Sequence, residues 1–405
     1  MHILIFLDQH PQSLGGAQTS VNLQRKFLER LGHKVTVVAP SGAHDDKNDE
    51  SVICLPSLPQ TLNREYTMVL NIKGCGEILD KKIATMPKID LVHVQGDLWG
   101  AILGIGFARR HNYPLVTTTH SNMEVGSIES FGVTLTKIGM FLYTRALLKH
   151  IGESKRLATT SAWNYIGIAT RNADLALAPS GHFAKLLKNN GVKTPLSIMR
   201  NGVDDDRIDE VLPEIESLRN QGPEVRLIWA GRMLPEKRLM QFVEAYKLAG
   251  VDAIVDLYGW GPDEKKAKAW LAENGIADRF VFHGVAPHSE MLRNYARADA
   301  LVQTSWGFET QGMTVFEAGA VGTPSIITDK NIADELPAGS YWVTESASIE
   351  DLAQALKRAV ADIKAGDKRG TALQGDESLR QSALTAKTVK LYEEVIANHW
   401  SRPTR

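Results

Sequence analysis

Short apolar runs alternate with amphipathic helical stretches along this chain, and the alternation starts twice. The first series opens with the apolar run His2–Leu7, followed by a glycine loop, a helical stretch at Ala17–Leu31 and a second run at Lys34–Ala39. Runs this short are typical of strands buried on both faces, and strands that alternate with helices form parallel sheets. The pattern therefore predicts an α/β fold of Rossmann type.

The same alternation predicts a second domain. Further strands of the first series are expected at Leu91–Val94, Leu115–Thr119 and Asp174–Pro179. A second series is expected at Arg226–Ala230, Ala253–Tyr258, Phe280–His283, Ala300–Gln303 and Ser325–Thr328. Between the two series, a short strand and then a polar turn are expected at Thr194–Asp206, and the charged stretch that follows, up to Gly222 and Pro223, lacks a core pattern and is interpreted as an interdomain connection. Since 405 residues exceed one compact core, we expect domains at 1–197 and 198–380, with a helix at about 380–405 packing back on the first.

Composition excludes several classes of protein. The formal net charge is −1, so the chain as a whole does not bind polyanions such as nucleic acid. Cys54 and Cys75 stand apart from each other and from any run of histidines, which argues against a structural zinc site and a disulfide scaffold. No signal-peptide pattern opens the chain, and no apolar run reaches the roughly 18–20 residues that span a bilayer. We therefore expect a cytoplasmic protein whose membrane contact, if any, is peripheral.

The loop Gly231–Arg238 follows the expected strand Arg226–Ala230 and carries Arg232 and Lys237. In open parallel sheets, ligands bind at the carboxyl ends of the strands. Two cations at such a position suit a diphosphate, which carries negative charge and gains more as it leaves. The alternative is a solvated loop in which Glu236 pairs locally.

The segment Glu309–Gly322 follows the expected strand Ala300–Gln303 and opens a helix. A helix start offers unpaired N–H groups to phosphate or sugar oxygens. Glu309 lies in the loop before this helix, where it can bond sugar hydroxyls. Glu317 is expected in the first turn, either bonding a ribose or closing a capping box with Thr314, and these two roles compete for one carboxylate.

A further glycine-containing loop follows an expected strand of the second series. In Leu257–Asp263, Gly259 and Gly261 permit a close approach of a ligand to the backbone. Their spacing is not that of a dinucleotide site, and a tight turn explains these glycines slightly better than a ligand does.

The first domain contributes the remaining candidates. Gly15 and Gly16 follow the first strand and can present backbone N–H groups to a phosphate. His120 ends an expected strand, where it can bond sugar hydroxyls or the acceptor, although a single histidine is more often structural. His93 is interpreted as a core histidine and Asp97, just beyond its strand, as a contact to the acceptor.

These elements, in this order, resemble the retaining glycosyltransferases of family 4, which have the GT-B architecture. The segment Glu309–Pro324 is similar to that family's E-x7-E element, and GRMLPEK, RNGVD and the Gly-Gly loop add to the match. The resemblance covers nearly the whole chain. It implies two Rossmann-like domains whose parallel sheets face each other across a cleft.

The resemblance also implies roles for individual residues. Arg232 and Lys237 would hold the diphosphate, Glu309 would contact the transferred sugar, and Val281–Val285 would lie near the base. The donor-binding residues would be Gly15, Gly16, Arg232, Lys237, Gly259, Val285, Glu309, Gln311, Gly312, Met313, Thr314 and Glu317. His120, Arg232, Lys237 and Glu309 would carry catalysis, and Asp97 with His120 would meet the acceptor. No metal is expected, because the family generally needs none and Asp204, Asp205 and Asp206 are interpreted as a polar turn.

Three loop sequences, ETQG, THSNMEV and ALAPS, resemble those of the family branch that glycosylates lipids such as diacylglycerol. The segment 134–171 supports this, because its basic residues outnumber its one acid, Glu153, and large apolar residues lie between them. The basic residues include Lys137, Arg145, Lys149, Lys155 and Arg156; the apolar ones include Phe141, Leu142, Leu147, Leu148, Trp163 and Tyr165. Such a segment suits an anionic membrane at the inner face of the cell membrane. A helix packed on its own domain with a solvated basic face is the alternative.

The sequence thus predicts a hexosyltransferase that uses a UDP- or GDP-hexose and a lipid acceptor. The same donor residues would serve an enzyme acting on a soluble sugar, a polyol phosphate or a glycan. A nucleotide-sugar epimerase, a phosphorylase and a non-catalytic binder share the architecture, and fold alone does not separate them. The E-x7-E element favours transfer.

Overall fold

The computed structural model describes residues 1–45, 49–367 and 369–401, and the chain divides into two compact units. The first unit comprises Met1–Gly202 and Gln381–Arg405, and the second comprises Val203–Arg380. The sequence placed the division between residues 197 and 198, a few residues earlier. No helix among the described residues is both long enough and apolar enough to cross a bilayer.

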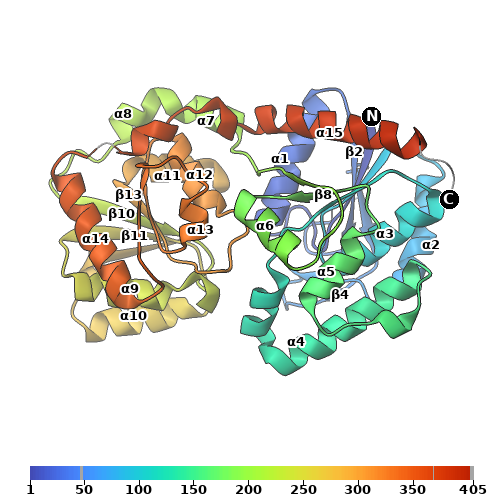
Figure 1. Ribbon diagram of the computed structural model, residues 1–405. Helices are drawn as coiled ribbons and strands as arrows, with labels where there is room; N and C mark the ends of the chain where they lie inside the picture. Colours follow the sequence, from blue (N-terminus) through green and yellow to red (C-terminus); the bar gives the residue numbers. More distant parts are fainter. Residues whose placement is uncertain (46–48, 368, 402–405) are drawn as a thin grey trace. The chain divides into compact units, whose positions relative to one another are not determined.

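The first unit contains a seven-stranded sheet in the order β3-β2-β1-β6-β7-β8-β9 (Figure 1). Every neighbouring pair in it is parallel. Its strands are β1 (His2–Phe6), β2 (Lys34–Pro40), β3 (Val52–Leu55), β6 (Leu91–Val94), β7 (Leu115–Thr118), β8 (Leu175–Ala178) and β9 (Leu196–Ile198). A short antiparallel pair, β4 (Leu58–Pro59) with β5 (Thr67–Met68), lies beyond β3 in the chain. The central strands are buried on both faces, as their apolar sequences predict.

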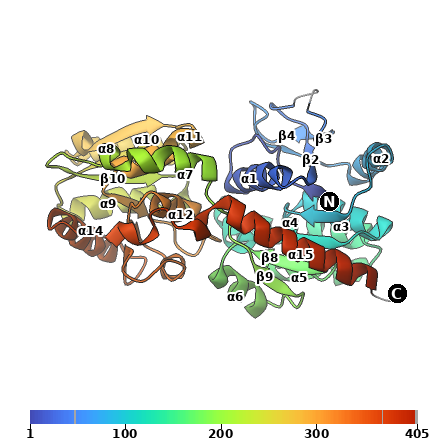
Figure 2. The same ribbon diagram turned by 90° about the horizontal axis from the view of Figure 1, so that it is seen from above.

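Helices cover both faces of this sheet, because alternate residues of β1 belong to two different cores. Leu4 and Phe6 pack with α2 (Ile72–Ile83), α3 (Trp99–His111), α4 (Met123–His150), α5 (Ala162–Thr170) and α6 (Gly181–Asn189). Ile3 and Ile5 pack on the other side, where α1 (Gly16–Arg30) and α15 (Gln381–Ser401) contribute Val21 and Tyr392. Figure 2 shows α15 lying along this unit, so the last helix packs with residues from the start of the chain.

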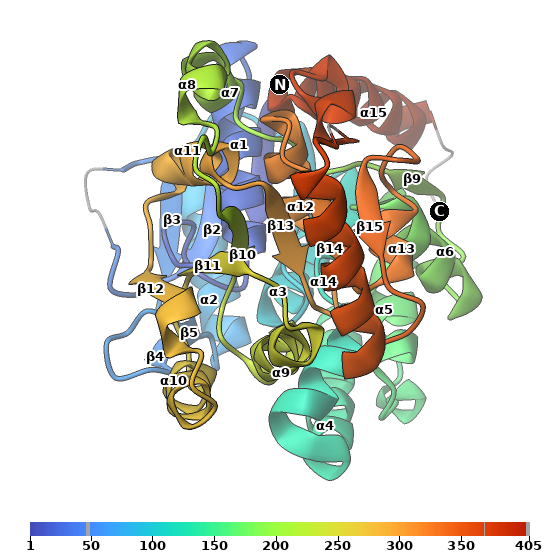
Figure 3. The same ribbon diagram turned by 90° about the vertical axis from the view of Figure 1, so that its left-hand side faces the viewer.

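The second unit contains a six-stranded parallel sheet in the order β12-β11-β10-β13-β14-β15, visible in Figure 3. Its strands are β10 (Val225–Ala230), β11 (Ala253–Tyr258), β12 (Phe280–Gly284), β13 (Ala300–Gln303), β14 (Ser325–Ile327) and β15 (Tyr341–Val343). Its α-helices are α7 (Asp205–Val211), α8 (Ile215–Leu218), α9 (Leu239–Ala249), α10 (Asp263–Glu273), α11 (His288–Arg297), α12 (Met313–Ala320), α13 (Lys330–Ala333) and α14 (Ile349–Lys364). Leu227 and Trp229 of β10 face a core with α9, α10 and α14, whereas Ile228 faces a core with α7, α11 and α12. The prediction of two α/β units with parallel sheets is confirmed.

Strand order locates the candidate sites. In each sheet the chain runs outward from one central strand, first to one side and then to the other. The reversal falls between β1 and β6 in the first unit and between β10 and β13 in the second. Because helices leave neighbouring strands toward opposite faces there, the carboxyl ends of these strands leave a crevice where ligands bind.

The short strand expected within Thr194–Asp206 is confirmed, because Leu196–Ile198 forms the edge strand β9 of the first sheet. The charged stretch interpreted as a connection is corrected, because it folds as α7 and α8. Ile208, Val211 and Ile215 are buried in the second core, although the surrounding charges hide their helical spacing. The polar turn at Asp204–Asp206 is corrected too: the Asp204 side chain accepts a hydrogen bond from the Asp206 N–H, and Asp205 and Asp206 form the first turn of α7.

Candidate functional site

In the second unit, the loops after β10 and β13 bring Lys237 and Glu309 together. Lys237 Nζ donates to Glu309 Oε1 in a short ion pair, and the Ser305 hydroxyl donates to the same oxygen at 2.9 Å. These residues are 72 positions apart in the chain, and only the strand order places them side by side. Both side chains stay partly accessible, with exposed fractions of 20% and 16%. The pair can therefore meet a ligand at the strand ends.

Buried polar contacts hold Lys237 in place. The Trp229 indole N–H donates to Thr304 Oγ1 at 2.9 Å, and the Thr304 hydroxyl donates to the Lys237 carbonyl at 2.6 Å. The next residue, Arg238, adopts a left-handed backbone and its side chain donates to the carbonyl oxygens of Thr304 and Ala347. The Lys237 ammonium is thus presented from a fixed backbone, which lowers the reorganisation that binding of an anion at this position would need.

Charge at this position favours an ionised Glu309. Burial raises the pKa of the Glu309 carboxyl, but Lys237, Ser305 and Arg232 lower it further, so the pKa lies below its ordinary value. Arg232 is half exposed and lies 3.7 Å from Glu236. The local pairing considered for Glu236 therefore involves Arg232, while Lys237 pairs with Glu309. Together the two loops present two cations beside one carboxylate.

Glu317 does not belong to a capping box. Helix α12 begins at Met313, one residue before Thr314, and its N-cap is Gly312 in a left-handed conformation. Glu317 is the fifth residue of the helix rather than part of its first turn. It is buried and accepts hydrogen bonds from His288 Nε2 at 3.2 Å and from the Tyr295 hydroxyl at 3.3 Å. The hydrogen bond to Glu317 raises the pKa of His288.

The backbone turns sharply at Gly312, directly before α12. Gly312 has φ 76°, and the first N–H groups of α12 follow it at Met313 and Thr314. No side chain among the described residues caps this helix end. A Cβ on Gly312 would lie 3.1 Å from Ile332, so a side chain at residue 312 would be both strained and crowded. Gln311 is buried beside this turn.

The glycines of Leu257–Asp263 have a structural explanation. Gly259 has φ 126°, and a Cβ there would lie 1.8 Å from the Gly231 carbonyl oxygen. The Gly231 N–H donates to the Tyr258 carbonyl at 3.0 Å, and the Met233 N–H donates to the Trp260 carbonyl at 2.8 Å. The close approach that these glycines permit is therefore made by the neighbouring loop that carries Arg232. Val285, expected near the base, is exposed after the edge strand β12.

In the first unit, Asp8 organises the ends of β1 and β6. Its carboxylate accepts the backbone N–H groups of Asp97, Leu98 and Gly100 at 2.6, 2.9 and 2.8 Å, at the start of α3. Burial raises the pKa of Asp8, and its N–H partners offset only part of that.

Asp97 and His120 lie next to each other beyond β6 and β7. The Asp97 carboxylate accepts hydrogen bonds from the N–H groups of His120 and Ser121 and from the Ser121 hydroxyl. Burial, and then the nearby Asp8, raise the pKa of Asp97 to about 7. His120 Nε2 lies 2.9 Å from Gln95 Oε1, and burial lowers the pKa of His120 to about 4, so this ring is neutral at pH 7.

His93 is a core histidine, as interpreted from the sequence. It is buried on β6, where Nδ1 bonds the Tyr392 hydroxyl at 2.6 Å and Nε2 bonds Thr118 Oγ1 at 2.7 Å. Burial, and then the neighbouring His120, lower its pKa to about 3. Gln95 bridges this buried pair to His120.

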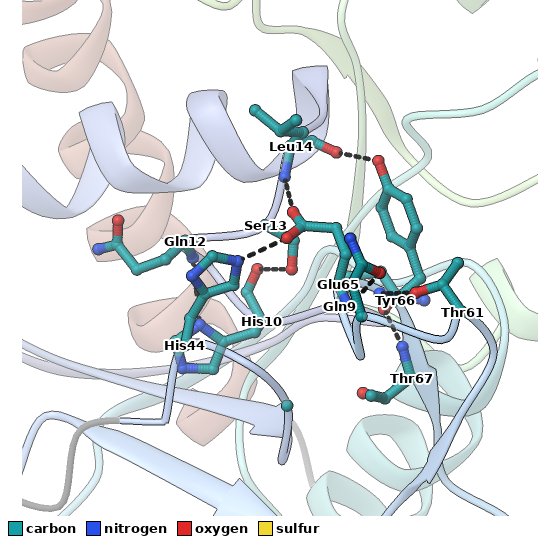
Figure 4. A network of polar contacts seen from close by, with 12 residues as sticks. Gln9, His10, Gln12, Ser13, Leu14, His44, Thr61, Glu65, Tyr66 and Thr67 are labelled. Atoms are coloured by element: carbon teal, nitrogen blue, oxygen red, sulfur yellow. Dashed lines mark hydrogen bonds and ion pairs between the residues drawn. The ribbon is translucent and has the colours of Figure 1, made fainter. Parts of the chain in front are cut away.

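A polar network braces the loop that carries Gly15 and Gly16 (Figure 4). The Leu14 N–H donates to Glu65 Oε1 at 2.8 Å, and the Tyr66 hydroxyl donates to the Leu14 carbonyl at 2.9 Å. Helix α1 begins at Gly16, and no described side chain caps its N-terminus. Backbone N–H groups at this end of α1 are therefore available to an anion.

Two protein families match consecutive parts of the chain. Residues 14–207 match the model described as "Glycosyltransferase Family 4", and residues 213–372 match "Glycosyl transferases group 1". The matches follow the division into two units and together cover every strand of the two sheets except β1. The chain belongs to the family 4 glycosyltransferases.

Individual proteins agree with this assignment. This glycosyltransferase is 24% identical over 371 residues to an alpha-monoglucosyldiacylglycerol synthase of Streptococcus pneumoniae, covering 89% of this chain and 78% of that protein. It is 26% identical to the alpha-monoglucosyldiacylglycerol synthase of Acholeplasma laidlawii, covering 82% of each chain. A structure of Anabaena HepE in complex with UDP and glucose superposes with a TM-score of 0.70 at 16% identity, covering 97% of this chain and 100% of that one. The glycosyltransferase therefore has the GT-B fold.

Several residues of the glycosyltransferase site were not found from the sequence. Asp8 directly follows β1 and Ser305 directly precedes the Glu309 loop, so their strand-end positions could have identified both. His288 and Tyr295 carried no such signal, because they reach Glu317 only through the packing of α11 on α12.

Proposed function

We propose that this glycosyltransferase transfers a hexose, with retention of the anomeric configuration, from a UDP-hexose or another nucleotide diphosphate hexose to a lipid acceptor. The observation that carries the donor half is the Lys237–Glu309 pair at the strand ends of the second unit. Lys237 and Arg232 bind the diphosphate, and Glu309 accepts hydrogen bonds from hydroxyls of the transferred sugar. Glu317 contacts the ribose, with His288 beside it.

The reaction follows from leaving-group stabilisation. The bond between the anomeric carbon and the β-phosphate oxygen breaks while the acceptor oxygen attacks from the same face. The acceptor proton passes to the leaving phosphate oxygen, and the two cations stabilise the charge that develops there. His120 and Asp97 of the first unit bond hydroxyl groups of the substrates. No metal ion takes part in this step.

The acceptor half rests on the outer face of α4. Its buried face is a stripe of Thr136, Met140, Thr144, Leu147 and Ile151, at helical spacing. Its outer face exposes five large apolar side chains among three basic ones, a composition that a solvated helix face does not need. The apolar residues are Val133, Leu135, Ile138, Phe141 and Leu142; the basic ones are Lys137, Arg145 and Lys149.

The structure corrects part of the expected membrane segment. Leu147, Leu148 and Tyr165 lie in the core and do not reach a surface, and Trp163 packs against that core and is partly buried. Exposed Leu157 continues the outer face in a short turn with Lys155 and Arg156. The helix is also broken at Gly132, with φ 75° and ψ 164°, so the outer face begins after that break.

Vesicle flotation tests the acceptor half. The double variant Phe141→Ser, Leu142→Ser is expected to lose flotation with anionic vesicles and transfer to diacylglycerol in those vesicles. A matched control, Leu31→Ser with Leu248→Ser, removes two equally exposed leucines elsewhere and is expected to retain both. If the wild type glycosylates soluble sugars or polyol phosphates and ignores vesicles, the lipid proposal is wrong.

Thermal shift tests the donor half. Ligands that bind the native state raise the melting temperature, so UDP, GDP, ADP and their hexose conjugates are compared in the presence of a chelator. We expect a shift with one nucleotide family, and NMR of the product is expected to give the donor's anomeric configuration. Failure of every nucleotide at millimolar concentration would contradict the donor site.

A further inference from the structure

We propose that His10, Asp45 and Cys54 bind one thiophilic divalent metal ion such as Zn²⁺, outside the sugar-transfer site. A nitrogen of His10, a carboxylate oxygen of Asp45 and the Cys54 sulfur all lie within 4.8 Å of one another. In the sequence these residues are far apart, and the two cysteines looked isolated. The fold brings the three donors together.

Strand order explains why the donors meet. β1, β2 and β3 are neighbours in the first sheet. His10 lies in the loop after β1, Asp45 lies in the loop after β2, and Cys54 lies near the end of β3. Since the three strands are parallel, their carboxyl ends lie at the same edge of the sheet. One ligand, Cys54, is therefore held by a strand, and the other two lie on loops that leave the neighbouring strands at the same edge.

The observed spacing is close to what a tetrahedral zinc site requires. With Zn–N and Zn–O bonds of about 2.0–2.1 Å and Zn–S bonds of about 2.3 Å, ligand atoms lie roughly 3.3–3.8 Å apart. The three donors need to move by about 1 Å, and Asp45 can do so because it is exposed on a loop. His10 is buried and Cys54 is half-buried, which limits competition from solvent. Water completes the coordination.

The donor set selects the class of metal. Thiolate and imidazole ligands favour Zn²⁺ and related ions over Mg²⁺ and Ca²⁺, which prefer oxygen. The Cys54 thiol hydrogen-bonds Asp45 without metal, and the ion replaces the thiol proton, which passes to solvent. Glu65 and Asp49 lie close enough to act on His10, so the surroundings also favour a cation.

The ion would stabilise the loop that leads to Gly15 and Gly16. His10 begins a turn in which its carbonyl accepts the N–H and the hydroxyl of Ser13, at 2.9 and 2.8 Å. His44 stacks on His10 with ring centroids 6.0 Å apart and pairs with Glu65, which holds Leu14 (Figure 4). A metal at His10 would therefore anchor this loop to β2 and β3. It would add stability and take no part in transfer.

Cobalt binding gives a direct test that does not depend on activity. The full chain is stripped with a chelator and titrated with Co²⁺, whose thiolate complexes show a charge-transfer absorption. We expect that absorption to saturate at about one ion per chain and to disappear when Zn²⁺ is added. Cys54→Ser is expected to abolish it and to weaken Zn²⁺ binding by more than about 100-fold, because changes outside the ligand shell alone cost about 10–100-fold.

The second cysteine supplies the matched control. Cys75 lies in the same unit and its thiol bonds the Pro56 carbonyl, away from His10. Cys75→Ser is expected to retain the cobalt absorption and the rise in melting temperature with Zn²⁺, while Cys54→Ser loses both. Metal-free melting temperatures of the wild type and Cys54→Ser should agree, which excludes misfolding as the cause. Absence of the absorption in the wild type, or its persistence in Cys54→Ser, would overturn the proposal.

Discussion

The two strand-order reversals of this glycosyltransferase share a topology and differ in charge. In the second unit, the loops after β10 and β13 hold an ion pair, Lys237 with Glu309, and a half-exposed Arg232. In the first unit, the loops after β6 and β7 hold His120, neutral at pH 7, and Asp97, whose pKa is about 7. One site offers fixed charges and the other offers hydrogen-bonding groups that burial keeps close to neutral.

The proposed function asks this architecture for two different kinds of binding group. A diphosphate needs cations at fixed positions, whereas sugar and acceptor hydroxyls need donors and acceptors of modest strength. The strand order supplies the position in both units, and the residues that follow each strand supply the chemistry. Variants that remove charge in one unit and hydrogen bonds in the other should therefore affect different steps.

The largest effect is expected for Lys237→Ala. Loss of a preorganised group that stabilises developing charge lowers kcat by about 10²–10³-fold. The variant also leaves Glu309 without its ion-pair partner, so Lys237→Ala combined with Glu309→Gln should cost less than the sum of the two single changes. Initial rates with a labelled donor measure both effects.

Lys247→Ala serves as the control, because Lys247 is an exposed lysine of α9 bonded to Asn274. It should leave kcat unchanged. Activity of Lys237→Ala within about threefold of the wild type would contradict the role of Lys237, since a neutral hydrogen bond alone is worth about that much or more.

A smaller effect is expected for His120→Ala. Loss of one hydrogen bond from a neutral ring costs about 0.5–1.5 kcal/mol, which corresponds to a decrease of up to about tenfold in kcat/KM. The affinity for the nucleotide diphosphate alone should not change, because its cations lie in the second unit. His111→Ala, at the exposed end of α3, is the control. Weaker nucleotide binding by His120→Ala would show that the two units do not divide these tasks.

We expect kcat/KM to depend on pH through the ionisation of Asp97. Because its pKa is about 7, the carboxylate that can accept a substrate hydroxyl forms as pH rises through 7, and kcat/KM should rise with it. Asp97→Asn should flatten this rise, and His120, with a pKa of about 4, should not contribute to it. An unchanged pH profile in Asp97→Asn would assign the titration to another group.

The raised pKa of Asp97 also makes the stability of the fold depend on pH, and stability changes in the opposite direction to activity. An unfolded aspartate has a pKa of about 3.9, so between about pH 4 and pH 7 the folded state holds a proton that the unfolded state releases. The contribution of Asp97 to the free energy of unfolding therefore decreases as pH rises through this window. Urea denaturation of the wild type and Asp97→Asn across the window measures it.

Much of this picture could be predicted from sequence, because the relevant signals are local. The strands His2–Phe6 and Val225–Ala230 are continuous apolar runs, and Lys237 and Glu309 lie in loops that directly follow strands. Strand-end position therefore identified the residues that now form the ion pair. The contact between Lys237 and Glu309 could not be predicted without knowing that β10 and β13 are neighbours in the sheet.

The sequence-based predictions were wrong at positions where tertiary packing determines the local structure. The helices at Asp205–Val211 and Ile215–Leu218 were missed because three buried residues among many charges give a weak pattern. The capping box failed because Gly312, in a left-handed conformation, is the N-cap, so the helix begins two residues earlier than a Thr314 cap requires. The crowding at Gly259 was also hidden from the sequence, because a Cβ there would meet the Gly231 carbonyl oxygen in the loop after the neighbouring strand.

The smallest effect is expected for Tyr392→Phe, which changes a buried residue that is linked to His120 through His93 and Gln95. The Tyr392 hydroxyl bonds His93 Nδ1 at 2.6 Å, and both residues are buried. Removing it leaves a buried imidazole nitrogen short of a partner and should lower the free energy of unfolding by about 1–2 kcal/mol. Tyr113→Phe, a ring stacked on Phe107, is the control. Because Gln95 lies between His93 and His120, kcat/KM should change less than it does in His120→Ala. If Tyr392→Phe lowered kcat/KM as strongly as His120→Ala while leaving stability unchanged, the last helix would act on the position of His120 rather than on the stability of the core.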